Sequence, residues 1–128
     1  MKKTILQFSY VAVVCLCIIS CKKDDPAPPS IVGTWTETSY VVSGCDDPTE
    51  NESETCTSSC DVVVFTETTM SSDGDTETYT KTGTTITVVY GSISITASYT
   101  VTETTLVITQ EDGAAFGGCK YVSTFKRS

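Results

Sequence analysis

The chain has 128 residues, with 16 acidic residues, eight basic residues and no histidine, and its net charge is −8 at pH 7. An acidic protein repels the phosphates of nucleic acids, so the composition argues against nucleic-acid binding. The absence of histidine removes the commonest general base and the commonest metal ligand. We therefore expect a non-enzymatic protein of one domain, with no cofactor and no metal site.

The N-terminal segment has the pattern of a secretory signal. Two lysines follow the first methionine, and an uncharged, largely apolar run extends from Thr4 to Ser20. The residues Ile18-Ile19-Ser20-Cys21 resemble a bacterial lipobox, in which the signal is cut before a cysteine that receives a lipid. We expect residues 1–20 to be a signal peptide and Cys21 to be the lipidation site. A retained transmembrane anchor is the alternative, because the run is barely long enough to span a bilayer.

The segment after Cys21 is expected to be a tether. A lysine followed by an acidic pair, in Lys22–Asp25, resembles the surface-export signal of Bacteroidetes lipoproteins, although such a run can also be a solvated linker. Pro26–Ser30 is typical of a semi-rigid, extended spacer. The chain from Cys21 onward has a net charge of −10, so its membrane anchor must be the covalent lipid rather than electrostatic attraction to anionic lipids. These features predict an outer-membrane lipoprotein, exposed at the cell surface if the export signal functions.

Residues 31–128 show the periodicity of strands and no convincing helical period. Threonine recurs with valine, isoleucine and tyrosine, which suit a half-buried pleated surface. Between residues 93 and 101, apolar and polar side chains alternate strictly, which indicates one face in the core and one in water. The predicted strands cover residues 31–42, 61–66, 70–72, 76–81, 84–90, 93–101, a segment containing Leu106 and Ile108, and 119–126.

Tight turns join these strands, as at Asp73–Gly74 and Gly91–Ser92. Short consecutive strands predict an all-β fold, a small antiparallel up-and-down β-barrel of about eight strands, or seven if residues 70–72 do not form one. Closure of the barrel removes the exposed sheet edges. An interior of this size is either filled by side chains or holds one small ligand.

The segment from Cys45 to Cys60 is acidic, shows no apolar periodicity and is predicted to be a long loop. Its carboxylates could bind a hard cation such as Ca²⁺ through oxygen ligands, but their spacing matches no EF-hand loop. A solvated acidic loop is the favoured interpretation. The carboxylates concerned are Asp46, Asp47, Glu50, Glu52 and Glu54.

Several motifs together resemble one family. Gly33-Thr34-Trp35 on the first predicted strand is similar to the Gly-x-Trp of lipocalins. The remaining pieces of the resemblance, to the lipocalin-like domains of Bacteroidetes lipoproteins, are Phe65, Thr82–Thr87, Thr104–Ile108 and Tyr121–Arg127. The resemblance covers residues 31–127 and implies that a late basic residue, Arg127 or Lys126, packs across Trp35. The chain is shorter than secreted lipocalins and lacks the helix that follows their barrel.

Four cysteines remain after the signal and Cys21 are set aside. An even number in an exported domain indicates two disulfides rather than a metal site. In an eight-stranded meander the first and last loops lie at the same end, and the last strand pairs with the first. We therefore expect Cys45–Cys119 with Cys56–Cys60, the alternative being Cys60–Cys119 with Cys45–Cys56.

The inward faces of the predicted strands suggest where a ligand would bind. They supply Trp35, Phe65, Tyr79, Ile86, Val88, Tyr90, Ile93, Ile95, Tyr99, Leu106, Ile108, Tyr121 and Phe125. The candidate ligand-binding residues among them are the aromatic residues Trp35, Phe65, Tyr90, Tyr99 and Tyr121, which would form an apolar pocket with phenol hydroxyls. A core filled by these side chains is the alternative.

Two functions follow, one from a barrel with a ligand pocket and one from a barrel filled by its own side chains. The first is a cell-envelope binding module for a small hydrophobic ligand, with a lipocalin-like barrel. The second is a surface interaction or accessory lipoprotein with a filled barrel, which binds a protein or glycan through its loops. A hydrolase that uses carboxylates is the least favoured, because most Asp and Glu residues lie in hydrophilic loops.

Overall fold

A computed structural model of the protein describes residues 26–113 and 117–128. The predicted signal peptide of residues 1–20 and the predicted lipidation site Cys21 lie outside the described residues. Within the described ranges, no helix is both long and apolar enough to cross a membrane. Pro26–Ser30 is exposed and has no regular secondary structure.

The described residues form nine strands and one short 3₁₀ turn. These are β1 (Gly33–Ser43), η1 (Pro48–Glu50), β2 (Glu52–Thr55), β3 (Val62–Phe65), β4 (Thr69–Ser72), β5 (Asp75–Thr82), β6 (Thr85–Tyr90), β7 (Ile93–Val101), β8 (Thr105–Glu111) and β9 (Lys120–Arg127). The strand predicted at residues 93–101 has the observed bounds, and the short strand predicted at residues 70–72 is confirmed as β4.

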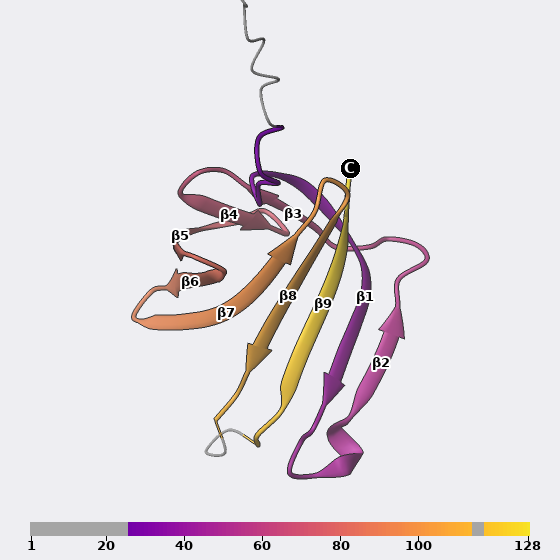
Figure 1. The fold of residues 1–128 in the computed structure, drawn as a ribbon. Helices are drawn as coiled ribbons and strands as arrows, with labels where there is room; N and C mark the ends of the chain where they lie inside the picture. Colours follow the sequence, from indigo (N-terminus) through magenta and orange to yellow (C-terminus); the bar gives the residue numbers. More distant parts are fainter. Residues whose placement is uncertain (1–25, 114–116) are drawn as a thin grey trace, which may run out of the picture.

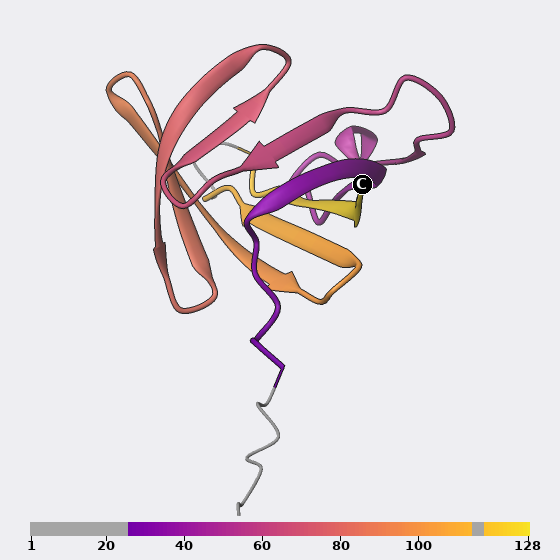
Figure 2. The same cartoon turned by 90° about the horizontal axis from the view of Figure 1, so that it is seen from above.

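The strands close into an antiparallel eight-stranded barrel, as the sequence predicted. Strands β3 to β9 pair in chain order, and β9 pairs with β1 from Trp35↔Arg127 to Ser43↔Lys120. The first part of β1 pairs with β3 and its last part with β2, so β2 is an extra strand on the outside of the ring. Figure 1 shows the long β1 beside β9, and Figure 2 shows the strands surrounding a common interior.

The prediction that residues 45–60 lack regular structure is wrong at two places. The carboxylate of Asp47 accepts hydrogen bonds from the backbone N–H of Thr49 (2.9 Å) and from its hydroxyl (2.6 Å), and this caps η1. Strand β2 then pairs with β1 although all of its residues are exposed. Because both of its faces are in water, no apolar alternation marks β2 in the sequence.

One end of the barrel is packed shut, and we call it the closed end. It carries the turns at 66–68, 83–84 and 102–104 and the entry of the chain at Ile31. The side chains of Trp35 and Leu106 are 0% exposed, and Phe65 is 1% exposed and meets the ring of Tyr79 edge-on at 5.4 Å. The buried cluster comprises Ile31, Trp35, Val63, Phe65, Tyr79, Ile86, Val88, Ala97, Leu106 and Phe125.

Arg127 covers this end of the core. Its guanidinium carbon lies 4.1 Å from the centre of the Trp35 ring, and the Trp35 indole N–H donates to the carbonyl of Ile31 at 2.7 Å. The expectation that a late basic residue packs across Trp35 is thus met by Arg127, whereas Lys126 is exposed. Gly33 allows this contact, because its φ is +143° and a Cβ there would lie 2.5 Å from Arg127 Nη1.

Candidate functional site

The opposite end of the barrel, which we call the open end, is where the wall is incomplete. It carries the turns at 73–74 and 91–92, the chain from Gly44 to Asn51, and residues 112–113 and 117–119. Strands β7 and β8 pair only from Val101↔Leu106 to Ser98↔Thr109, although β7 begins at Ile93 and β8 continues to Glu111. Figure 1 shows β7 bending away from β8 toward this end.

A cleft of about 490 Å³ lies where the two strands separate. One wall is the start of β7, with Ile93 63% exposed and Ile95 half-buried. The other wall is the end of β8 and the two residues after it, where the side-chain amide of Gln110 donates to Asp112 Oδ1 at 3.0 Å. The cleft therefore combines an apolar, uncharged wall with an acidic one, and we call it the β7–β8 cleft.

Two smaller hollows lie elsewhere on the described barrel. One, of about 180 Å³, is lined by Glu37, Tyr40, Glu54, Cys56, Ser58, Ser59, Cys60 and Asp61. The other, of about 210 Å³, is lined by Met70, Ser72, Asp73, Asp75, Glu77 and Tyr90. The first is mostly polar and acidic, and the second places Met70 and Tyr90 beside three carboxylates. The β7–β8 cleft is the largest of the three and offers the most apolar surface to a ligand.

The open end is strongly acidic. The only described basic residue there is Lys120, which lies 3.6 Å from the carboxylate of Glu111, with both side chains well exposed. Lys81, Lys126 and Arg127 lie toward the closed end. The carboxylates on loops and strands toward the open end are Asp46, Asp47, Glu50, Glu52, Glu54, Asp73, Asp75, Glu77, Glu111 and Asp112. Their combined field attracts cationic groups and repels anionic ones.

This field and partial burial shift several pKa values. Burial raises the pKa of Glu37, a hydrogen bond with Ser123 partly offsets this, and the nearby carboxylates of Asp61 and Glu54 raise it further. Burial and neighbouring carboxylates raise the pKa of Tyr40. A hydrogen bond with Asp112 is the main cause of the raised pKa of Tyr121. The two tyrosine rings stack with their centres 6.4 Å apart.

Two disulfides hold the segment between β1 and β3 in place, and both were expected. Cys45–Cys119 joins the end of β1 to the start of β9, and Cys56–Cys60 closes a short loop after β2. The backbone N–H of Asp46 also donates to the carbonyl of Gly117 at 2.8 Å. These bonds fasten the segment before β2 to the barrel wall.

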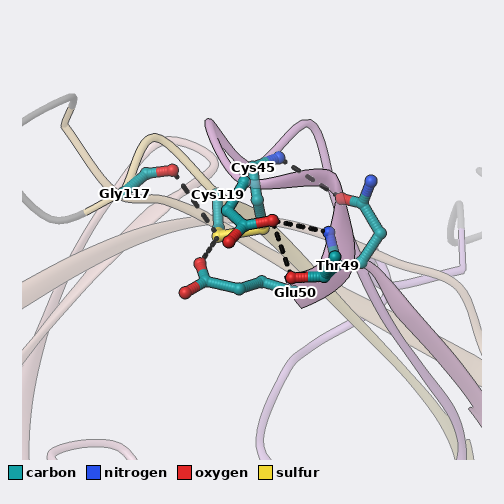
Figure 3. The surroundings of a disulfide bond; sticks show 7 residues. Cys45, Thr49, Glu50, Gly117 and Cys119 are labelled. Carbon is teal, nitrogen blue, oxygen red and sulfur yellow. Dashed lines mark hydrogen bonds between the residues drawn. A yellow bond between two sulfur atoms is a disulfide. The ribbon is translucent and has the colours of Figure 1, made fainter.

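The carboxylate of Glu50 lies next to the first disulfide. One of its oxygens is 3.8 Å from Sγ of Cys119, as Figure 3 shows. Cys45, Glu50 and Cys119 are close enough to hold a metal ion, but both sulfur atoms are engaged in the disulfide and offer no thiolate. The group therefore stabilises the fold rather than binding a metal.

The five aromatic residues proposed to bind a ligand do not converge on one cavity. Trp35 and Phe65 are part of the packed core, and the half-buried Tyr99 packs against it and donates to the carbonyl of Gly83 at 3.1 Å. Tyr121 belongs to a second cluster with Val42, Tyr40 and the Cys45–Cys119 disulfide. Tyr90 alone lines one of the three hollows described above.

The alternation of the strands also predicts that Tyr90 and Ile93 face the interior. Tyr90 is 39% exposed and Ile93 63% exposed, because they flank the turn at 91–92 where β8 no longer covers the wall. The β7–β8 cleft itself was missed from the sequence. The only available signal was the uncharged segment 82–102, which carries the large residues Tyr90 and Ile93 on either side of the turn at 91–92.

Comparisons of this chain with models of protein families, with curated proteins and with solved structures found no match.

Proposed function

We propose that the protein is a non-enzymatic, lipocalin-like binding module of the bacterial cell envelope that takes a small hydrophobic ligand into the β7–β8 cleft. One observation supports this most directly. The closed end is filled by its own side chains, whereas the open end has a hollow of about 490 Å³ with Ile93 and Ile95 on its wall. A preformed concave site with apolar surface and a few polar groups is typical of ligand binding.

Uptake of an uncharged apolar dye tests this proposal. N-phenylnaphthylamine is suitable because an anionic dye would be repelled by the acidic rim. We expect saturable fluorescence enhancement, with binding about fivefold weaker for Ile93→Thr, which removes apolar surface from the cleft wall. Val62→Thr is the matched control, since Val62 is 43% exposed on β3, outside the cleft. No uptake, or equal weakening by both substitutions, would refute the assignment.

The anchor is a separate part of the proposal. The chain enters the barrel at its closed end through the exposed segment Pro26–Ser30, as Figure 1 shows, so a lipid on Cys21 would direct the open end away from the membrane. When cells are grown with labelled palmitate, we expect the label to be incorporated into the wild-type protein and not into the Cys21→Ser variant. Outer-membrane location at the cell surface predicts digestion by protease added to intact cells. Absence of label, or recovery in the inner membrane, would contradict it.

A second candidate function is supported by the two disulfides. They hold the acidic segment 44–61 against the barrel, as expected for a rigid surface that binds a protein or glycan. Substitution of Glu52 and Glu54 by Gln should then reduce co-purification of envelope components from cells while dye uptake stays unchanged. Unchanged co-purification would exclude β2 as the binding surface.

A further inference from the structure

In the part of the chain that the structure describes, the β7–β8 cleft has unpaired backbone groups on its β7 side. The backbone N–H of Tyr99 in β7 donates to the carbonyl of Thr84, which directly precedes β6. The backbone N–H and C=O groups of the odd-numbered residues of β7 therefore point toward β6, and those of the even-numbered residues point toward β8. The β7–β8 ladder ends at Ser98. Ser94 and Thr96 therefore direct their N–H and C=O groups into the cleft, and among the described residues no backbone partner meets them.

The β8 side presents a matching edge. The backbone N–H of Asp112, just after β8, donates to the carbonyl of Cys119, just before β9, at 2.9 Å. The backbone groups of the even-numbered residues of β8 therefore point toward β9. Thr109 is the last residue that pairs with β7, and Glu111 follows with its backbone groups directed into the cleft. Two sheet edges thus face each other across a hollow, and neither has a backbone partner within residues 26–113 and 117–128.

The β7 edge of the cleft differs from the free edge of β2. On β2 two of the four residues, Glu52 and Glu54, are acidic, and the strand is short, features that discourage strand addition. The β7 edge belongs to segment 82–102, which has no charged residue, and Ile93 and Ile95 stand beside it. An uncharged edge with apolar side chains is suited to receive another strand.

We propose that the ligand of the β7–β8 cleft is a short extended peptide, which inserts as an additional strand between β7 and β8. This inference rests on the proposed function and names its ligand class. Only a strand with both edges free can bond β7 and β8 together, which excludes β7 of a second copy, since its other edge is occupied by β6. The inserted strand would complete the barrel wall.

The walls also define the side chains of the peptide. Alternate residues of an inserted strand face the barrel interior next to Ile95, so they must be apolar. The residues that flank the strand meet the acidic rim, with Glu111 and Asp112 nearest, so they must be basic. The ligand is therefore a segment of about five residues with alternating apolar side chains and lysine or arginine at its ends.

A synthetic peptide tests this assignment with the purified, oxidised protein. The probe is Lys-Val-Thr-Val-Thr-Val-Lys with blocked termini, and its binding is followed by fluorescence anisotropy of an attached dye. We expect saturable binding that weakens at least about tenfold when the two threonine nitrogens are methylated, because methylation removes backbone donors and keeps the side chains. Replacement of both lysines by glutamate should abolish binding. Equal affinity of the methylated peptide would overturn the proposal.

A variant of the protein tests the same bonds from the other side. Ser94→Pro removes an N–H that points into the cleft and is not bonded to β6, so the barrel should stay folded. Peptide binding should fall at least about tenfold, while Ser53→Pro on the free edge of β2 should leave it unchanged. Unchanged binding by a folded Ser94→Pro would refute the inserted strand. If Ser94→Pro does not fold, the methylated peptide still decides.

The dye and the peptide separate the two proposals. Dye uptake that is sensitive to Ile93→Thr, without binding of the peptide, would keep the ligand site and refute the peptide as its ligand. Failure of both would refute the site itself. Peptide binding that dye displaces would support both.

Discussion

Removal of the Arg127 side chain should be the most damaging single change at the closed end that leaves the core intact. Its guanidinium donates to three backbone carbonyls, those of Glu103 (2.8 Å), Val32 (3.1 Å) and Ser30 (2.8 Å). It also lies 4.1 Å from the centre of the Trp35 ring. One side chain therefore joins the chain entry, the turn between β7 and β8, and the largest residue of the core.

The size of the effect follows from these contacts. A partly desolvated cation–π contact contributes about 1–2 kcal/mol. The three hydrogen bonds contribute less than charged bonds usually do, roughly 0.5 kcal/mol each, because water can replace the donor at partly exposed carbonyls. We expect Arg127→Ala to lower the free energy of unfolding by about 3 kcal/mol. Arg127→Lys should cost about half as much, because it keeps the charge and loses the planar fork.

Urea denaturation of the oxidised protein measures these differences. Lys126→Ala is the matched control, since Lys126 is the exposed neighbour on the same strand and should change stability by less than about 0.5 kcal/mol. A double-mutant cycle with Trp35→Phe should show coupling of about 1 kcal/mol with Arg127. A loss for Arg127→Ala no larger than that for Lys126→Ala would refute the role of this residue as a cap.

Two further predictions concern the open end. Replacement of both Cys45 and Cys119 by alanine should lower the free energy of unfolding by about 4 kcal/mol, whereas replacement of Cys56 and Cys60 should lower it by about 2 kcal/mol. The difference follows from the sequence separations, which are 74 and 4 residues. Equal losses in urea denaturation would contradict this prediction. Burial raises the folded-state pKa of Glu37, so its ionisation costs stability above that pKa and costs nothing below the unfolded-state value. Glu37→Gln should raise the free energy of unfolding by roughly 0.5 kcal/mol at pH 7, a value reduced because the side chain is partly exposed, and should not change it near pH 3. An equal gain in urea denaturation at both pH values would point to another cause.

The barrel was predictable because its signals are local. Strict alternation at 93–101 and turn residues such as Asp73–Gly74 each mark one element, and short consecutive strands leave few topologies other than a meander. The pairing of Cys45 with Cys119 followed from the closure of the last strand on the first. Strand β2 could not be found this way, since it owes its conformation to hydrogen bonds with β1 and buries neither face.

The site was less predictable, because it depends on where pairing stops. Sequence alternation places Ile93 and Tyr90 on the inner face of the barrel, but it does not show that β8 leaves β7 after Thr109. An inward residue without a covering strand is exposed, as Tyr90 is, whereas the other four aromatic residues expected to bind a ligand lie in or against the two packed clusters. Trp35 and Phe65 fill the closed end because Arg127 and Ile31 cover them, and no local pattern shows such long-range contacts.

The separation of β7 from β8 follows from what each strand is bonded to on its other side. Ile93 is held to Tyr90 of β6 by a two-residue turn, so the start of β7 follows the β6 hairpin. The end of β8 follows β9, because Asp112 bonds Cys119, and Cys119 is tied to β1 by its disulfide with Cys45. The disulfide thus fixes one wall of the β7–β8 cleft, while the other wall belongs to an uncharged hairpin held by backbone bonds and side-chain packing. A rigid wall opposite a less constrained one can admit a strand without breaking any existing pair.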